Sequence, residues 1–250
     1  MNAIRSILFN LSFYLFTLIY ATFCMLPLCL LKTDTMLRKG IHGYCIGSLF
    51  LARWVMGIKQ SYRGVEQLPK SGAYIFAAAH QSYMDPIMTY MIRQDVTALA
   101  KKELFSIPVI GALLAKARII KIDRQAGTAH RKMETVIDQA VNLGRPIIVY
   151  PQATRVKPYE RKELKSGAYF LQQSGDLPVY TVATTTGAFW TKGLWHKSGH
   201  AIFEVVRGLP QNLSKDDFMA LIEEDVVNRS EQLFGEVGVK NPVSAEVKSA

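Results

Sequence analysis

A histidine and an aspartate five positions apart are the residues of this chain best suited to move a proton. His80 follows the apolar run at residues 74–79, and Asp85 is followed at once by Pro86. An imidazole can take a proton from an alcohol near neutral pH, while a carboxylate on its other nitrogen fixes the tautomer. On one straight helix the two side chains would point about 140° apart, so their contact requires a turn. The alternative is that Asp85 caps the helix that Pro86 opens and that His80 is an ordinary junction residue.

The elements around this pair follow the pattern of an α/β layer structure. From about residue 60, short apolar runs alternate with amphipathic segments. Helices are expected at 128–142, just before Gly144, and after Ser214, which can cap the second one. The expected strands are residues 74–79, 96–100, 119–122, 146–150, 179–184 and 201–206. The predicted fold is a mixed sheet flanked by helices, with His80 at the carboxyl end of a strand, where such folds usually hold ligands.

The N-terminal segment predicts attachment to a membrane. Residues 7–31 carry no charge, and as a helix they would extend about 37 Å, which is enough to cross a bilayer. A second apolar stretch at 37–58 makes a helical hairpin in one leaflet an equal alternative. Basic residues are denser after the first run, which favours a catalytic domain on the cytoplasmic face. The expected organisation is an anchoring segment at 1–58, a catalytic domain at 59–238 and a flexible tail at 239–250.

Composition limits the classes of partner. The 250 residues are 49% hydrophobic, which suffices for one sizeable core. Lys and Arg outnumber Asp and Glu by 30 to 20, and the net charge of +10 implies nucleic acid, anionic lipid or a phosphorylated substrate. The apolar N-terminal segment favours the membrane over nucleic acid, and no zinc spacing or basic recognition helix argues against it. Three cysteines are too few for a disulfide framework, and no metal ligand cluster is visible.

Four short blocks occur in order along the middle of the chain: HQSYMD at 80–85, KKELFSIPVIG at 101–111, IIKIDR at 119–124 and YPQATR at 150–155. In order and spacing they resemble the blocks of the 1-acylglycerol-3-phosphate acyltransferase family. The resemblance covers roughly residues 60–210, and the conjunction is more specific than any single block. It implies transfer of an acyl group from an acyl thioester to the sn-2 hydroxyl of lysophosphatidic acid, which gives phosphatidic acid.

The resemblance also implies a role for individual residues. His80 would be the general base and Asp85 its orienting partner. Arg124 and Arg155 would hold the phosphate of the acceptor, and Lys101 is a further candidate for that anion. Guanidinium groups bind phosphate bidentately, which agrees with these roles, whereas the alternative is a solvated basic face. No cofactor or metal is implied, and the expected partners are a lysophospholipid, membrane lipid and a donor that is acyl-CoA or acyl carrier protein.

The block at 150–155 departs from the family pattern. Where the family has Glu-Gly before Thr-Arg, this chain has Gln152 and Ala153. Gln152 can still hydrogen-bond a glycerol hydroxyl, and Ala153 is tolerated if the backbone there keeps a negative φ. Thr154 either orients the loop or caps a backbone group. The change leaves two alternatives open, namely an acyltransferase for another lyso-lipid and a catalytically silent module that binds lipid phosphate.

Overall fold

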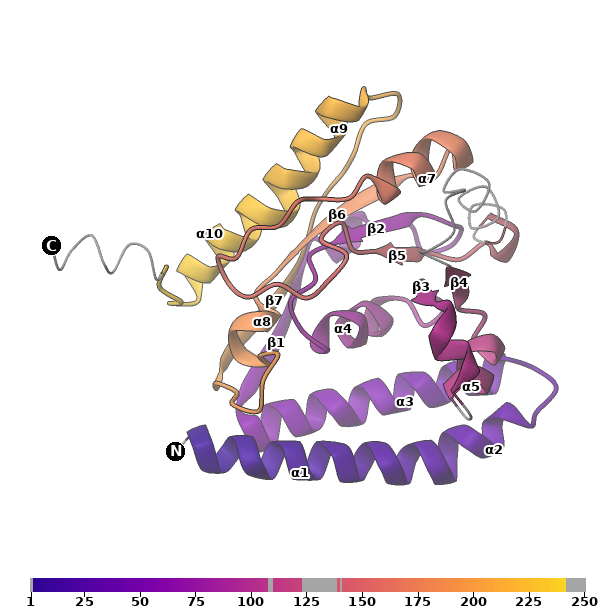
Figure 1. Ribbon diagram of the computed structural model, residues 1–250, viewed down its shortest axis with the longest axis vertical. Helices are drawn as coiled ribbons and strands as arrows, with labels where there is room; N and C mark the ends of the chain where they lie inside the picture. Colours follow the sequence, from indigo (N-terminus) through magenta and orange to yellow (C-terminus); the bar gives the residue numbers. More distant parts are fainter. Residues whose placement is uncertain (1, 108–109, 123–138, 140, 242–250) are drawn as a thin grey trace, which may run out of the picture.

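A seven-stranded sheet forms the centre of the molecule (Figure 1). The structure is a computed structural model, and it describes residues 2–107, 110–122, 139 and 141–241. The strand order is β1-β7-β6-β2-β5-β3-β4, in which β6 and β7 are antiparallel and the other neighbours are parallel. The strands are β1 Ile58–Arg63, β2 Ile75–Ala78, β3 Thr97–Lys101, β4 Ile120–Ile122, β5 Ile147–Val149, β6 Val179–Thr184 and β7 Gly199–Gly208. The predicted mixed sheet flanked by helices is confirmed.

All six predicted strands are present, and the sequence analysis missed β1. Among the described residues this strand pairs with β7 alone, at one edge of the sheet. Its sequence is IKQSYR, and Ile58 is its single buried residue. An edge strand that buries so little has no apolar run to reveal it. By contrast, β2 lies between β5 and β6 and is buried throughout, which explains why its apolar run is continuous.

The side chains of β2 alternate between two cores, as the pleat of a strand requires. Ile75 and Ala77 belong to a core beneath α7 and α9, whereas Phe76 and Ala78 belong to the core beneath α4. In Figure 1, α7, α9 and α10 cover one face of the sheet, and α4 lies on the other. The helices of the body are α4 Met84–Ile92, α5 Ile110–Lys116, α7 Gly167–Gly175, α8 Thr186–Phe189, α9 Lys215–Ile222 and α10 Arg229–Glu236.

The predicted cap of the C-terminal helix is confirmed. The Oγ of Ser214 accepts a hydrogen bond from the backbone N–H of Asp217 at 3.1 Å. A π-helical segment at Glu223–Asn228 then joins α9 to α10. The helix expected at 128–142, apart from its last positions, lies outside the described residues, and so does the expected tail from residue 242 onward.

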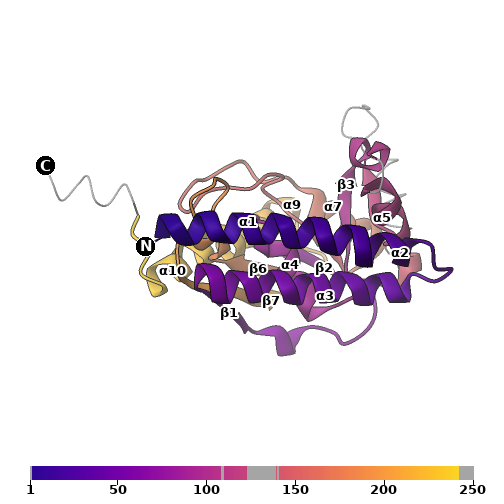
Figure 2. The same ribbon diagram turned by 90° about the horizontal axis from the view of Figure 1, so that it is seen from below.

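The N-terminal segment folds as a helical hairpin. Its first arm is α1 Asn2–Tyr20, continued by a π-helical turn and α2 Leu26–Cys29, and its second arm is α3 Thr35–Leu51. The arms run side by side beneath the body (Figures 1 and 2). The helical stretch Asn2–Cys29 is 28 residues long, and its most apolar 18-residue window has a mean hydropathy of 1.8 and is only 6% buried. An apolar helix that is left this exposed, and is long enough to cross a bilayer, indicates association with a membrane.

Polar contacts fix α1 to the loop that follows α8. The backbone N–H of His196 donates to Ser6 Oγ at 2.8 Å, and Asn10 Nδ2 donates to the carbonyl of Leu194 at 2.8 Å. The Nε2 atom of His196 lies 3.0 Å from Asn10 Oδ1. Burial lowers the pKa of His196, so the ring is neutral at pH 7 and needs no counter-ion. The hairpin is therefore docked on the body in a defined position, close to the loops of the candidate site.

Candidate active site

The candidate site begins where β2 ends. Residues 79–83 form the turn between β2 and α4, and His80 stands in that turn while Asp85 lies in the first turn of α4. The turn brings together two side chains that one straight helix would separate. The Nδ1 atom of His80 lies 3.1 Å from Oδ2 of Asp85. Because Asp85 is fully buried and the His80 side chain is 21% exposed, Nε2 is the ring nitrogen left for a substrate.

The carboxylate of Asp85 is surrounded by hydrogen-bond donors from the turn before α4, from His80 and from Thr186. Its Oδ2 accepts the backbone N–H groups of Gln81 at 2.6 Å and Ser82 at 2.8 Å, in addition to its contact with His80. Its Oδ1 accepts the hydroxyl of Thr186, which is itself fully buried. A carboxylate with this many donors has a fixed orientation, so its contact with the imidazole is fixed too.

The helix-capping alternative for Asp85 is wrong. The residue that caps α4 is Tyr83, and the Asp85 carboxylate contacts N–H groups of the turn before the helix. The N–H of Met84, at the start of the helix, instead donates to Ser82 Oγ at 3.1 Å. Asp85 therefore shapes the turn that presents His80.

The ring and backbone of His80 have further contacts that restrict them. Its ring stacks on that of Tyr150, with the centroids 4.0 Å apart and the planes 17° apart. Its carbonyl accepts the N–H of Val156 at 2.9 Å. Burial, and then the negative charge of Asp85, raise the pKa of Tyr150 well above its usual value, so the phenol under the imidazole stays neutral.

Gln152, in the block at 150–155, accepts a hydrogen bond from the backbone of His80. Its Oε1 accepts the backbone N–H of His80 at 2.6 Å, and the residue is only 6% exposed. The sequence analysis expected this side chain to be available for a glycerol hydroxyl, but its carbonyl oxygen is already used. The substitution of glutamine for the family's glutamate keeps an acceptor for this N–H.

The condition stated for the next position, a negative φ, is not met. Ala153 has a φ of +55°, in the left-handed region that favours glycine. The loop has therefore kept the backbone conformation that the family's glycine would adopt, although the residue is alanine. A left-handed alanine costs about 1 to 2 kcal/mol relative to ordinary backbone, so this loop carries strain beside the site.

Arg155 follows that strained turn and lies over an aromatic ring. Its guanidinium carbon is 3.9 Å from the ring centroid of Tyr83, and its Nη1 is buried without a hydrogen-bond partner within the described structure. A buried guanidinium donor of this kind suits an anion.

The other predicted binding residues are less closely tied to the pair. Thr154 is exposed, and among the described residues its side chain has no hydrogen-bond partner. Lys101 is the last residue of β3, and among the described residues no hydrogen bond or ion pair joins it to His80 or Asp85. Arg124 lies outside the described residues.

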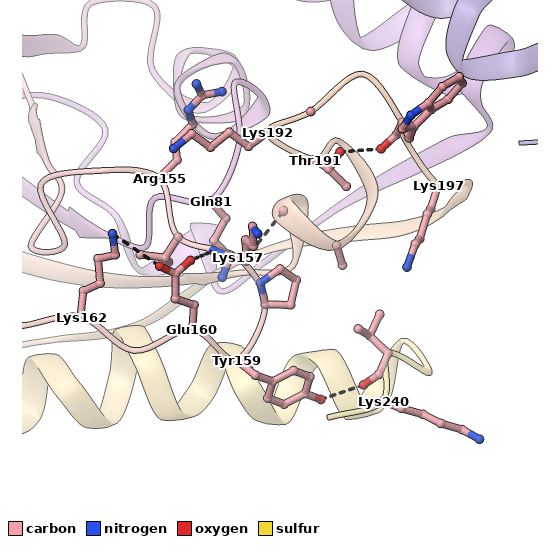
Figure 3. A pocket seen from close by; sticks show the side chains of 17 residues that line it. Gln81, Arg155, Lys157, Tyr159, Glu160, Lys162, Thr191, Lys192, Lys197 and Lys240 are labelled. Atoms are coloured by element: carbon pink, nitrogen blue, oxygen red, sulfur yellow. Dashed lines mark hydrogen bonds and ion pairs between the residues drawn. The ribbon is translucent and has the colours of Figure 1, made fainter. Parts of the chain in front are cut away.

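Two cavities are lined by residues next to the pair in the sequence, namely Gln81 in one and Tyr83 and Pro86 in the other. The first, of about 930 Å³, is lined by Gln81 and by most of the loop after Arg155 (Figure 3). Its basic lining residues are Arg155, Lys157, Lys162, Lys192, Lys197 and Lys240. The second, of about 530 Å³, lies between the hairpin and the start of α4. Its apolar and aromatic lining residues are Phe13, Tyr14, Tyr44, Tyr83, Pro86, Ile87, Trp190 and Leu194. We call them the basic cavity and the apolar cavity.

Sequence reasoning missed two residues that complete the pair's surroundings. Thr186 bonds Asp85, and Gly187 donates its N–H to Gln81 Oε1 at 3.2 Å. A side chain at Gly187 would place its Cβ 2.6 Å from that of Gln81, so only glycine allows this approach. The sequence did carry a signal for them, the run TTTG at 184–187, which begins at the last residue of the strand predicted at 179–184. That strand is a parallel neighbour of β2, so polar residues at its carboxyl end lie at the same edge of the sheet as His80.

Three comparisons with known proteins bear on this geometry. A family model described as Acyltransferase matches residues 59–185. The 1-acyl-sn-glycerol-3-phosphate acyltransferase of Pseudomonas aeruginosa is 26% identical over 197 residues, which are 78% of this chain and 76% of that protein. The human 1-acyl-sn-glycerol-3-phosphate acyltransferase beta is 22% identical over 224 residues, 85% of this chain and 80% of that protein.

The fold is also similar to a solved structure. The crystal structure of the 1-acyl-sn-glycerophosphate (LPA) acyltransferase PlsC from Thermotoga maritima superposes with a TM-score of 0.76. The alignment covers 93% of this chain and 98% of that one, at 22% sequence identity. The hairpin and the sheet therefore share one fold with that protein.

Proposed function

Because the chain belongs to the acyltransferase family, whose model matches residues 59–185, we propose that it is a 1-acyl-sn-glycerol-3-phosphate acyltransferase. It would transfer an acyl group from a thioester donor, acyl-CoA or acyl carrier protein, to the sn-2 hydroxyl of lysophosphatidic acid. The similarity to proteins named for this activity, over most of the chain, supports the acceptor.

One observation carries the proposal: a basic cavity and an apolar cavity are lined by sequence neighbours of the pair, Gln81 in the first and Tyr83 and Pro86 in the second. Tyr83 lines the apolar cavity, and the guanidinium of Arg155, which lines the basic cavity, rests on its ring. An acceptor with a phosphate at one end and an acyl chain at the other matches this arrangement. With the phosphate at Arg155 and the chain toward the hairpin, its free hydroxyl would lie near His80.

The geometry supports a single general base. His80 Nε2 would take the proton of the acceptor hydroxyl as its oxygen attacks the thioester carbonyl, while Asp85 holds the opposite nitrogen and stabilises the imidazolium. The tetrahedral intermediate then collapses, the C–S bond breaks, and the proton on His80 passes to the departing thiolate. A thiol with a pKa of about 8.5 leaves readily, so one base suffices.

The position of Gln152 weakens the closest rival, an acyltransferase for another lyso-lipid. That rival rests on the loss of the family's glutamate, but Gln152 bonds the backbone of His80 through its carbonyl oxygen. The substitution is thus accounted for without a change of acceptor. The intact contact between His80 and Asp85 likewise argues against a silent lipid-phosphate module.

Attachment to the membrane follows from the same arrangement. The apolar cavity is lined partly by α1, so an acceptor lipid would reach His80 from the side of the hairpin. A soluble donor would approach from the aqueous side. The excess of basic residues after the first apolar run favours the cytoplasmic face for the body.

The test is acyl transfer by the purified full-length protein in detergent. Lysophosphatidic acid should be the preferred acceptor over lysophosphatidylcholine and monoacylglycerol, and His80→Ala should lower kcat by about 10³-fold or more without unfolding the protein. Equal rates on acceptors with and without a terminal phosphate would reject the proposed acceptor. Near-normal turnover by His80→Ala would reject the general base.

A further inference from the structure

The basic cavity holds more positive charge than the acceptor requires. Lysophosphatidic acid has one phosphate, with a charge of about −1.5 to −2 at pH 7, and Arg155 is placed to meet it. Four further lysines line this cavity and not the apolar one, namely Lys157, Lys162, Lys197 and Lys240. Lys162 pairs with Glu160, and we call the other three the cavity lysines.

No carboxylate neutralises the cavity lysines. Within the described part of the chain, none of their ammonium groups has an ion pair within 4.0 Å, whereas Lys162 pairs with Glu160 at 3.4 Å. Glu160 is the single acidic residue among those that line the cavity. In Figure 3 the cavity lysines stand around the opening on different chain segments. Like charges gathered in a concave surface repel one another and attract a polyanion.

Two residues that line the basic cavity also hydrogen-bond the catalytic pair. Val156, which lines it, donates its N–H to the carbonyl of His80. Gln81 lines it too, and its N–H bonds Asp85. A ligand whose charged end occupies the cavity would therefore have its other end beside the pair. Two other lining residues are joined to each other, because the hydroxyl of Tyr159 donates to the carbonyl of Val239 at 2.7 Å.

We propose that the basic cavity binds the nucleotide end of acyl-CoA, with the phosphate groups at the cavity lysines and the thioester directed toward His80. A CoA nucleotide carries a 3′-phosphate and a diphosphate, which together match several cations. The volume of about 930 Å³ lies within the range of small-molecule sites, about 300 to 1,000 Å³. The exposed ring of Trp195 at the rim offers an aromatic face to the adenine.

The shape of the surface favours a nucleotide over a carrier protein. An acidic carrier protein would dock its convex surface on a flat basic face, whereas these cations surround a hollow. This inference rests on the proposed acyl transfer from a thioester, but it is independent of the acceptor.

Direct binding of CoA to the full-length His80→Ala protein tests the proposal without turnover. By calorimetry, Lys157→Gln/Lys197→Gln should weaken CoA binding at least tenfold, and 3′-dephospho-CoA should bind the unaltered cavity more weakly than CoA does. The control Lys32→Gln/Lys70→Gln removes the same charge from exposed positions that do not line the cavity. This control should change the Kd for CoA by no more than about twofold relative to the protein without the lysine substitutions, because exposed charges beyond a Debye length are screened.

Kinetics of the wild-type and lysine variants complete the test. The KM for palmitoyl-CoA should rise in Lys157→Gln/Lys197→Gln, while the KM for lysophosphatidic acid stays unchanged. A rise in the KM for acyl carrier protein with unaltered CoA binding would overturn the proposal in favour of a protein partner, and loss of binding only to anionic vesicles would overturn it in favour of lipid. Failure of acyl transfer to lysophosphatidic acid with CoA binding intact would reject the proposed acceptor alone.

Discussion

Two loops meet at the candidate site, and they are built in opposite ways. The turn at residues 79–83 is held from all sides, since Asp85 accepts four hydrogen bonds and Gln81 and Ser82 use both backbone and side chain. The loop at 150–155 contains a left-handed alanine at Ala153, and Arg155 leaves a buried donor without a partner in the described structure.

The difference matches the role that we propose for each loop. A proton acceptor works only if its orientation is fixed before the substrate arrives, so His80 and Asp85 have little freedom. A phosphate-binding side chain must instead keep its donors free until the phosphate takes them. An unpartnered buried donor destabilises the empty protein by about 1 to 3 kcal/mol, and that deficit is removed when an anion binds. Four predictions test this contrast.

Removing the charge at the centre of the rigid turn should have the largest effect. Asp85→Asn keeps the volume but places an amide among donors, so it cannot orient the imidazole in the same tautomer. We expect kcat to fall by about 10²- to 10⁴-fold. The measurement is turnover with lysophosphatidic acid, with circular dichroism as the control for folding. A folded Asp85→Asn protein with kcat within tenfold of wild type would contradict the role of Asp85.

A smaller loss should follow from Thr186→Val, which removes only the hydroxyl that Asp85 accepts. Because one of four donors is lost and the shape is kept, we expect kcat to fall about tenfold, equivalent to about 1.4 kcal/mol, with the KM of both substrates unchanged. A normal kcat would mean that Thr186 serves only packing.

In the other loop, Arg155→Lys should change binding and leave the chemical step nearly intact. An ammonium is a point charge and cannot reproduce a bidentate contact with phosphate. The KM for lysophosphatidic acid should rise about tenfold with kcat within about twofold. The KM for palmitoyl-CoA is the internal control, and it should not change. A fall in kcat without a change in the acceptor KM would place Arg155 with the rigid turn instead.

The smallest effect should be a gain in stability from Ala153→Gly. Glycine adopts a φ of +55° without strain, although it also adds freedom to the unfolded chain. The net gain should be about 0.5 to 1 kcal/mol, which raises Tm by about 1 to 4 °C in a protein of this size. Thermal unfolding in detergent measures it, and kcat should stay within twofold. A lower Tm would show that the loop is not strained at this residue.

Local sequence determined much of this protein. Apolar runs placed six of the seven strands, because a buried strand must be apolar wherever it crosses the core. The ordered blocks identified His80 and Asp85 and the family, because their residue types carry the chemistry. Ser214 was recognisable as a cap from its neighbours alone.

The tertiary structure decided the rest. Thr186 reaches Asp85 across 101 positions, and Gln152 reaches His80 across 72. Such contacts arise only when β6, β2 and β5 lie side by side and bring their carboxyl ends to one edge. The positive φ of Ala153 could not be predicted from the sequence either, because the surrounding loop imposes a conformation that alanine by itself disfavours. Residue types fix which groups are available for chemistry, whereas the packing of distant strands fixes which of them meet.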